Sequence, residues 1–236
     1  MRLLVPLAIV ATFLPNALAF SGKTCRIMPL GASITYGDES SQKNGYRDDL
    51  YLALERDGNT VDMVGNNPAP PDSTFKDKDT EGWTGFIIDR VAEKMRISMP
   101  RNHPNIATVL VGTNDMTGNV DPAGAPARLG KLIDDLLDFP PLTMVVVSSL
   151  PPNSNTTDNS RINTYNAAIP GVVEQRADAK GWVIFADCGK VVGLGDLADG
   201  THPNDVGYQH IGKCFYDGIV EGERRGWLAP VMGPPP

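Results

Sequence analysis

Five short apolar runs, separated by segments with helical spacing, constrain the fold of this chain more than any other feature. The runs are almost continuously hydrophobic, as strands are in a parallel sheet that helices cover on both faces. They comprise residues 25–30, 60–64, 106–111, 144–147 and 182–186. Apolar residues recur every three or four positions, as in amphipathic helices, in residues 45–58, 86–95, 122–139, 161–180 and 205–225. The sequence predicts a three-layer α/β/α sandwich around a mostly five-stranded parallel sheet.

Two prolines interrupt this pattern. Proline cannot donate a hydrogen bond to a neighbouring strand, so Pro29 predicts that the first strand ends at Met28. Pro170, followed by Gly171, predicts that the helix at residues 161–180 is kinked or split in two.

The first 19 residues differ in character from the rest. Arg2 is followed by an uncharged, largely apolar stretch and then by small residues at Ala17 and Ala19, which is the pattern of a secretory signal peptide. We expect this segment to be removed and the product to be secreted into the extracellular space. One domain is expected over residues 20–229, followed by a frayed proline-rich tail at residues 230–236.

The charge of the chain disfavours two classes of partner. A formal net charge of -7 and a pI of about 4.9 are unfavourable for binding nucleic acid or anionic membranes. After the signal segment, no apolar stretch approaches the roughly 20 residues that a membrane-spanning helix needs. We therefore expect a soluble monomer that binds neither nucleic acid nor membrane.

Three cysteines in an oxidising compartment favour one disulfide and one unpaired thiol. Cys188 and Cys214 lie on either side of residues 199–202, so we expect these two to pair and Cys25 to stay buried in the first strand. The alternative, that none is bridged, stays open. Asn155 begins an N-glycosylation sequon in a polar loop, and we expect a glycan there.

Polar side chains follow three of the predicted strands. Ser33 comes after the first strand, Asn114 after the third, and Asp199 and His202 after the fifth. Ligands bind beyond the carboxyl ends of such strands, so we expect these side chains to lie near one another. A serine hydroxyl becomes a nucleophile when a base removes its proton, and a histidine oriented by an acid is such a base. Ser33, His202 and Asp199 are therefore predicted to be nucleophile, base and acid, although Ser33 by itself would equally suit a helix cap.

These residues occur in four blocks that resemble the SGNH hydrolases, the GDSL-like esterases. The blocks are residues 31–35, 82–85, 112–115 and 199–204. Within that group, residues 26–31, 44–47 and 81–83 are most similar to carbohydrate esterase family three, the secreted acetylxylan esterases. One position departs from the family, because Ala32 stands where the first block usually has aspartate. We expect this alanine to alter loop hydrogen bonding without abolishing catalysis.

The resemblance implies an oxyanion hole as well as a triad. Its donors would be the backbone amide of Ser33, a glycine amide of the second block and the side-chain amide of Asn114. Gly85 is the favoured glycine because it stands at the mouth of a predicted helix, where unpaired amides point outward, and Gly82 is the alternate.

Two aromatic residues, Tyr36 and Trp83, are candidate substrate contacts, since a sugar ring can lie against such side chains. No cofactor is expected, and no histidine or cysteine spacing indicates a metal site.

The resemblance implies a secreted serine esterase that removes acetyl groups from plant cell-wall polysaccharide such as acetylxylan. The acetylated polysaccharide or oligosaccharide would be its partner. Two other interpretations are a general short-chain acyl esterase or lysophospholipase-type lipase, and a noncatalytic secreted carbohydrate-binding protein. The fold and the triad do not distinguish between the two enzymes.

Overall fold

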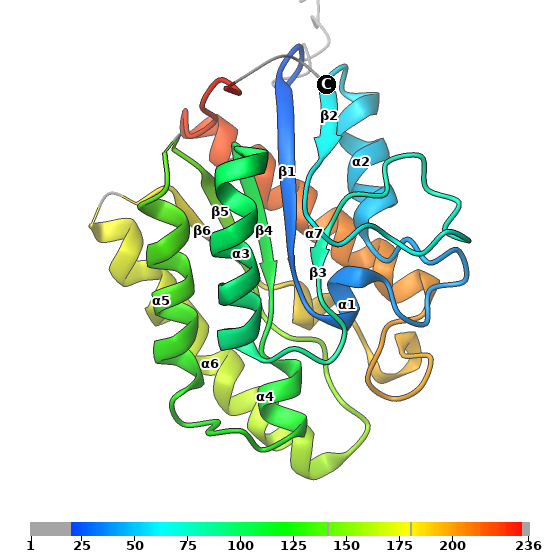
Figure 1. The fold of residues 1–236 in the computed structure, drawn as a ribbon. Helices are drawn as coiled ribbons and strands as arrows, with labels where there is room; N and C mark the ends of the chain where they lie inside the picture. The colour runs from blue at the N-terminus through cyan, green and yellow to red at the C-terminus, as the bar shows by residue number, and fades with distance from the viewer. Residues whose placement is uncertain (1–19, 141, 180, 233–236) are drawn as a thin grey trace, which may run out of the picture.

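One parallel sheet lies between two layers of helices (Figure 1). The computed structural model describes residues 20–140, 142–179 and 181–232. The predicted signal peptide and the last four residues of the predicted tail lie outside the described residues. The prediction of a three-layer α/β/α sandwich is confirmed.

The sheet has six strands, each parallel to its neighbours. They are β1 (Thr24–Gly31), β2 (Thr60–Met63), β3 (Glu81–Gly82), β4 (Ile106–Leu110), β5 (Met144–Ser148) and β6 (Val183–Ala186). The order across the sheet is β2-β1-β4-β5-β6, and β3 pairs with β1 beyond the end of β2. Five strands match the predicted apolar runs, whereas β3 is too short to give such a run.

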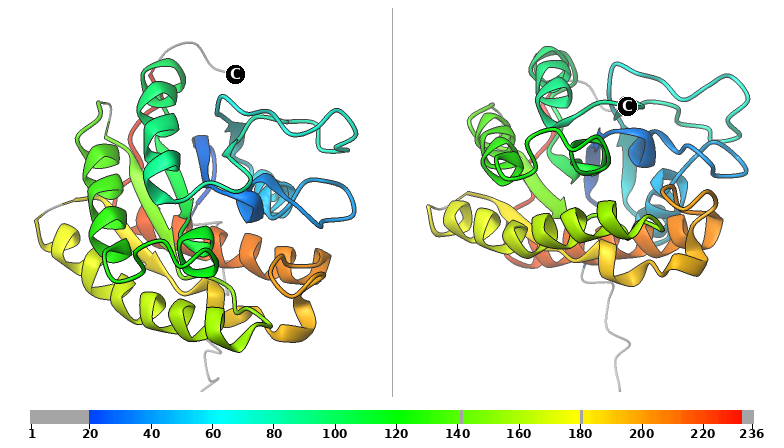
Figure 2. Two further views of the ribbon diagram at one scale, coloured as in Figure 1. Left: turned by 60° about the horizontal axis from the view of Figure 1, so that its bottom comes forward. Right: turned by 90° about the horizontal axis from the view of Figure 1, so that it is seen from below.

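The helices divide between the two faces of the sheet. The longer ones are α2 (Arg47–Arg56), α3 (Ile88–Asn102), α5 (Ala125–Leu137), α6 (Thr156–Asp178) and α7 (Asp205–Arg224). Helix α7 packs against α2 and passes behind the sheet in Figure 1, whereas α3 and α5 lie in front of it and α6 packs on α5 (Figures 1 and 2). Within the described residues, no helix is both long enough and apolar enough to cross a membrane.

Several short elements complete the fold. They are α1 (Ser33–Tyr36), α4 (Thr113–Thr117) and the 3-10 turns η1 (Cys188–Val191) and η2 (Leu194–Asp196). Each has five residues or fewer, which is too short to show the apolar spacing that indicates a helix in a sequence.

Pro29 lies inside β1, so the predicted strand end at Met28 is wrong. The carbonyl groups of Ile27 and Gly31 accept hydrogen bonds on the side of β2 and β3. The N–H and C=O of one residue in a parallel strand point to the same side, so the nitrogen of Pro29 faces that side too. There β2 has already ended, and β3 begins only opposite Leu30. The proline therefore interrupts no ladder hydrogen bond.

Helix α6 runs through Pro170 as one helix, so the predicted split is wrong. Proline removes one backbone hydrogen bond from a helix interior. The missing hydrogen bond does not end the helix, because α6 buries apolar side chains on both sides of the proline. These are Ile162, Tyr165, Ile169 and Val173. Burial of these side chains stabilises the helix by several kcal/mol, at roughly 1.5–3 kcal/mol for each large apolar group.

The predicted disulfide is present. Cys188 in η1 is bonded to Cys214 in α7, across a sequence separation of 26 residues. Cys25 is unpaired and buried in β1, as predicted, and burial raises the pKa of its thiol to about 12. The bond joins the chain after β6 to α7, so it closes residues 188–214, which include Asp199 and His202, into a covalent loop.

We expect Cys188→Ala/Cys214→Ala to lower the free energy of unfolding by about 3 kcal/mol, because a loop of this length restricts the unfolded chain by that amount in the chain-entropy account. Urea unfolding without reductant measures the difference. Dithiothreitol should lower the stability of the parent protein to the same value and leave the double variant unchanged. Equal stability of parent and variant without reductant would contradict the expectation.

Candidate active site

The predicted site residues come together at the carboxyl edge of the sheet. Ser33 is the first residue of α1, directly beyond β1, and Asn114 lies in α4, directly beyond β4. Asp199 and His202 lie between η2 and α7, far along the chain. The adjacent positions of α1 and α4 below β1 and β4 can be followed in Figure 1.

Ser33, His202 and Asp199 form a chain of hydrogen bonds. The Oγ of Ser33 lies 2.9 Å from Nε2 of His202, and Nδ1 of His202 lies 2.7 Å from Oδ2 of Asp199. A proton held on Nδ1 by the carboxylate leaves Nε2 free to accept one from the serine. The Ser33 side chain is buried except at this edge, with 5% of the residue exposed. The arrangement can activate a serine hydroxyl as a nucleophile.

Asp199 is held in its charged form. Burial by itself raises the pKa of its carboxyl. The backbone N–H of His202, the His202 ring and the N–H of Thr201 outweigh this effect and lower the pKa to about 2. Oδ1 accepts both backbone bonds, at 2.7 Å from His202 and 2.9 Å from Thr201. The loop's own backbone therefore fixes one carboxylate oxygen while the other faces the imidazole.

The loop that carries His202 packs against the segment before α6 and is hydrogen-bonded to it. Gly200 adopts a left-handed φ of 88°, and a Cβ built there would lie 2.1 Å from Oγ of Ser154. The N–H of Ser154 donates to the Gly200 carbonyl at 2.8 Å, and Nδ2 of Asn153 donates to Oγ1 of Thr201 at 3.0 Å. The left-handed backbone and the contact with Ser154 both favour glycine at position 200.

The two glycines proposed as oxyanion donors differ in environment. The N–H of Gly82 donates to Oγ1 of Thr80 at 3.0 Å and is therefore occupied. Gly85 has a left-handed φ of 81° and is exposed, and within the described residues its N–H has no hydrogen-bond partner. Asn114 donates one Nδ2 hydrogen to the Phe86 carbonyl at 2.9 Å, which leaves the second hydrogen available. The availability of its N–H favours Gly85 over Gly82 as the donor.

The two candidate substrate contacts are both partly buried. Trp83 donates from Nε1 to Oε1 of Glu81 at 2.8 Å, its ring stacks on Phe86, and the Lys94 ammonium lies 4.2 Å from its centroid. These contacts occupy much of the indole within the protein. Tyr36 ends α1, where its carbonyl accepts from Nη2 of Arg47 at 3.2 Å.

Asp115 is a buried residue of the third block to which the sequence analysis assigns no role. Its carboxylate accepts from the N–H of Ile88, at the start of α3, and from Nη2 of Arg128. Burial raises the pKa of Asp115 above its usual value, although the bonds from Arg128 and Ile88 oppose this shift. It therefore ties α4, which carries Asn114, to α3. Its place directly after Asn114 is the one sequence signal that pointed to it.

Ala32 occupies the N-cap position of α1, where no side-chain hydrogen bond is made. Instead the carbonyl of Ser33 accepts from the N–H groups of Gly37 and Asp38, at 2.8 and 3.0 Å. Gly37, with φ of 99°, packs so closely on Gly45 that a Cβ would lie 2.6 Å from its nitrogen. Backbone contacts thus hold the short helix.

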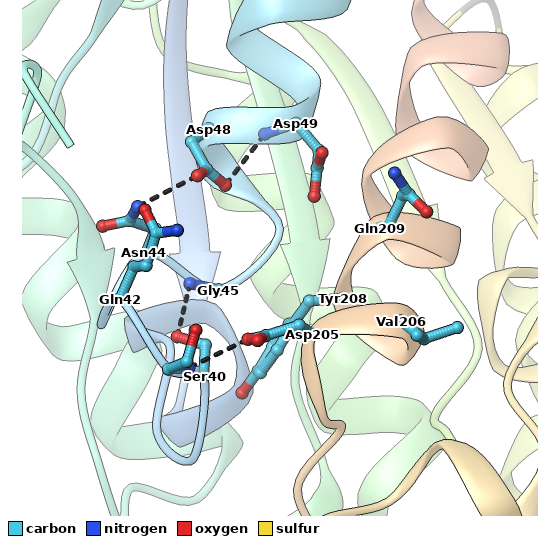
Figure 3. Close-up of a pocket in the computed structure, with 11 residues that line it drawn as sticks. Ser40, Gln42, Asn44, Gly45, Asp48, Asp49, Asp205, Val206, Tyr208 and Gln209 are labelled. Atoms are coloured by element: carbon cyan, nitrogen blue, oxygen red, sulfur yellow. Dashed lines mark hydrogen bonds between the residues drawn. The ribbon is translucent and has the colours of Figure 1, made fainter. Parts of the chain in front are cut away.

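A polar groove of about 270 Å³ adjoins this region, between the loop after α1, the start of α2 and the start of α7 (Figure 3). Asp205 and Tyr208 reach from α7 toward that loop. Oδ1 of Asp205 accepts from the N–H of Ser41 at 2.9 Å. None of the predicted site residues lines the groove.

No metal site is evident in residues 20–140, 142–179 and 181–232, where no three histidine, cysteine, aspartate or glutamate side chains are grouped to hold an ion.

Comparison with known proteins places these features in one family. A family model described as the GDSL-like Lipase/Acylhydrolase family matches residues 30–210. A multidomain esterase of Ruminococcus flavefaciens is 32% identical over 255 residues, which cover 94% of this chain. The chain spans only 32% of that relative's length.

Two solved carbohydrate esterases of family 3 have the same fold. The enzyme from Clostridium thermocellum is 28% identical with a TM-score of 0.76, over 87% of this chain and 100% of the other. That from Talaromyces cellulolyticus is 25% identical with a TM-score of 0.70, over 85% of this chain and 99% of the other. The predicted similarity to the SGNH hydrolases is confirmed, and the chain belongs to the GDSL-like lipase/acylhydrolase family.

Proposed function

We propose that this protein is a serine esterase that hydrolyses acetyl esters on plant cell-wall polysaccharide such as acetylxylan. The observation that carries the proposal is the hydrogen-bonded chain from Ser33 through His202 to Asp199. The similarity to family 3 carbohydrate esterases over almost the whole of their length supports a carbohydrate ester as substrate.

In the first step, Ser33 Oγ attacks the acetyl carbonyl while Nε2 of His202 takes the hydroxyl proton. The tetrahedral intermediate collapses when His202 returns that proton to the sugar oxygen, which leaves as an alcohol. Water then attacks the acetyl-serine by the same route and releases acetate. Asp199 keeps the proton on Nδ1 and balances the charge of the imidazolium.

The negative charge on the carbonyl oxygen needs hydrogen-bond donors. The backbone N–H groups of Ser33 and Gly85 and the second Nδ2 hydrogen of Asn114 would supply them. A donor of this kind contributes about 10²–10³ in rate when it is fixed before the reaction.

The proposal extends to the location of the protein. A signal-peptide pattern in residues 1–19 and the disulfide between Cys188 and Cys214 both support secretion. Asn155 is exposed and caps α6 through Oδ1, which accepts from the N–H groups of Thr157 and Asp158. A glycan attached at Nδ2 would leave this cap intact.

We expect Ser33→Ala to abolish release of acetate from acetylated xylan and from p-nitrophenyl acetate, with stability nearly unchanged, because the hydroxyl acts chemically. Acetate assays on a panel of acetylated glycans measure the activity and its specificity. Residual turnover within tenfold of the parent would exclude Ser33 as the nucleophile. Faster turnover of longer acyl chains than of acetyl groups would favour a general acyl esterase, and binding without hydrolysis would favour a carbohydrate-binding protein.

We expect Asp199→Asn to reduce turnover by orders of magnitude, but less than His202→Ala does.

Because the pKa of Asp199 is lowered to about 2, its carboxylate stabilises the folded state above its unfolded pKa, near 4. This stabilisation is lost as the pH falls through about 2. The difference in unfolding free energy between parent and Asp199→Asn should therefore shrink as the pH falls from 5 to 2. A difference that grows as the pH falls from 5 to 2 would contradict this assignment.

A further inference from the structure

Asp38 joins three segments that are far apart in the sequence. Its N–H donates to the carbonyl of Ser33 at 3.0 Å, and its own carbonyl accepts from the hydroxyl of Tyr208 at 2.5 Å. Its side-chain Oδ2 accepts from Oγ1 of Thr84 at 2.9 Å. One residue thus contacts the nucleophile helix, the helix that follows His202 and the turn of the second block.

Thr84 is the direct neighbour of Gly85, whose N–H is the proposed oxyanion donor. Backbone and side-chain bonds also hold this turn to the sheet edge, because the N–H of Trp83 donates to the Gly31 carbonyl at 3.0 Å and Nδ2 of Asn114 donates to the Phe86 carbonyl at 2.9 Å. A Cβ built on Gly85 would have no atom within 4 Å, and β3 before it has only two residues. The bond from Thr84 to Asp38 joins the turn directly to the end of α1.

The bond between Thr84 and Asp38 links the turn of the second block to Ser33. The backbone N–H of Asp38 holds the Ser33 carbonyl and its side chain holds the Thr84 hydroxyl, so both are positioned by the same residue. Tyr208, 1% exposed, connects the start of α7 to it as well. Without the bond from Thr84, the turn would keep its bonds to Gly31 and Asn114 but would lose its side-chain bond to Asp38, which holds the Ser33 carbonyl.

We propose that Asp38 is a positioning residue, which through Thr84 sets the Gly85 amide at the distance from Ser33 that the tetrahedral intermediate requires. The inference rests on the proposed esterase function. An oxyanion donor acts on the charge that develops in the transition state, so the effect of the link should fall on kcat and not on binding of the ester. Loss of the link should lower kcat about tenfold and leave KM within twofold, since a misplaced donor is weakened but not removed.

The test uses the full chain and p-nitrophenyl acetate. Thr84→Val removes the hydroxyl at nearly constant shape on an exposed residue, and Asp38→Ala removes its acceptor. Both should lower kcat about tenfold, and the double variant should lose no more than either single variant. Asp38→Asn and Thr84→Ser each keep the bonding atom and should stay within threefold of the parent. Thr164→Val is the matched control, because Oγ1 of Thr164 donates to the Ser160 carbonyl and both residues are exposed on α6.

Three kinetic results would overturn the inference: kcat of Thr84→Val within twofold of the parent, additive losses in the double variant, or a raised KM with kcat unchanged. Crystal structures of Thr84→Val and Thr164→Val test the same point without activity. The turn from Trp83 to Phe86 should shift relative to α1 in Thr84→Val alone, and an unmoved turn also overturns the inference. Hydrolysis that persists in Ser33→Ala would instead overturn the proposed function, while the crystallographic comparison would still decide the role of Asp38.

Discussion

The close approach of β1 to β4 at Gly31 is the contact on which the rest of the site depends. A Cβ at this position would lie 2.2 Å from the carbonyl of Leu110 and 2.3 Å from Oγ1 of Thr35. Only glycine allows the end of β1, its neighbour strand and the first helix to pack at this distance. Gly31 pairs with Leu110 in register, so the chain leaves both strands at the same level of the sheet. Ser33 and Asn114 follow within a few residues and are therefore brought to one edge by the ladder itself.

His202 reaches that edge by a different means. It belongs to no strand, and its position depends on side-chain and backbone contacts with neighbouring loops. Asp199 organises the loop from within, and Asn153 and Ser154 support it from outside. The proposed nucleophile is thus placed by the sheet and the proposed base by a hydrogen-bonded loop. The sheet is the more rigid of the two supports, so geometry at the base is the more sensitive to single polar substitutions.

The sequence was enough to predict the layers, the strands and the residues that gather at the edge, because buried parallel strands and their carboxyl ends leave strong local patterns. It was not enough where a neighbour decides the outcome. Pro29 is tolerated only because β2 and β3 leave a gap beside it. The start of α6 at Thr156 was missed because residues 156–160 carry no apolar spacing and depend on the cap from Asn155. The roles of Asp115 and Asp38 lie in contacts with distant segments, which no local pattern encodes.

The bond between Ser33 and His202 joins residues 169 positions apart. A ribosome makes the chain from its N-terminus, and domains fold largely as units once enough of the chain has emerged. Helix α7, which follows His202, covers β5 and β6 and packs on α2, so the apolar face beneath it stays open until that helix has been made. A nascent chain that stops before His202 holds Ser33 without its proposed base and exposes the apolar surface that α7 would cover. In the proposed esterase, the appearance of activity and the closing of the core would therefore be one event in the life of the molecule.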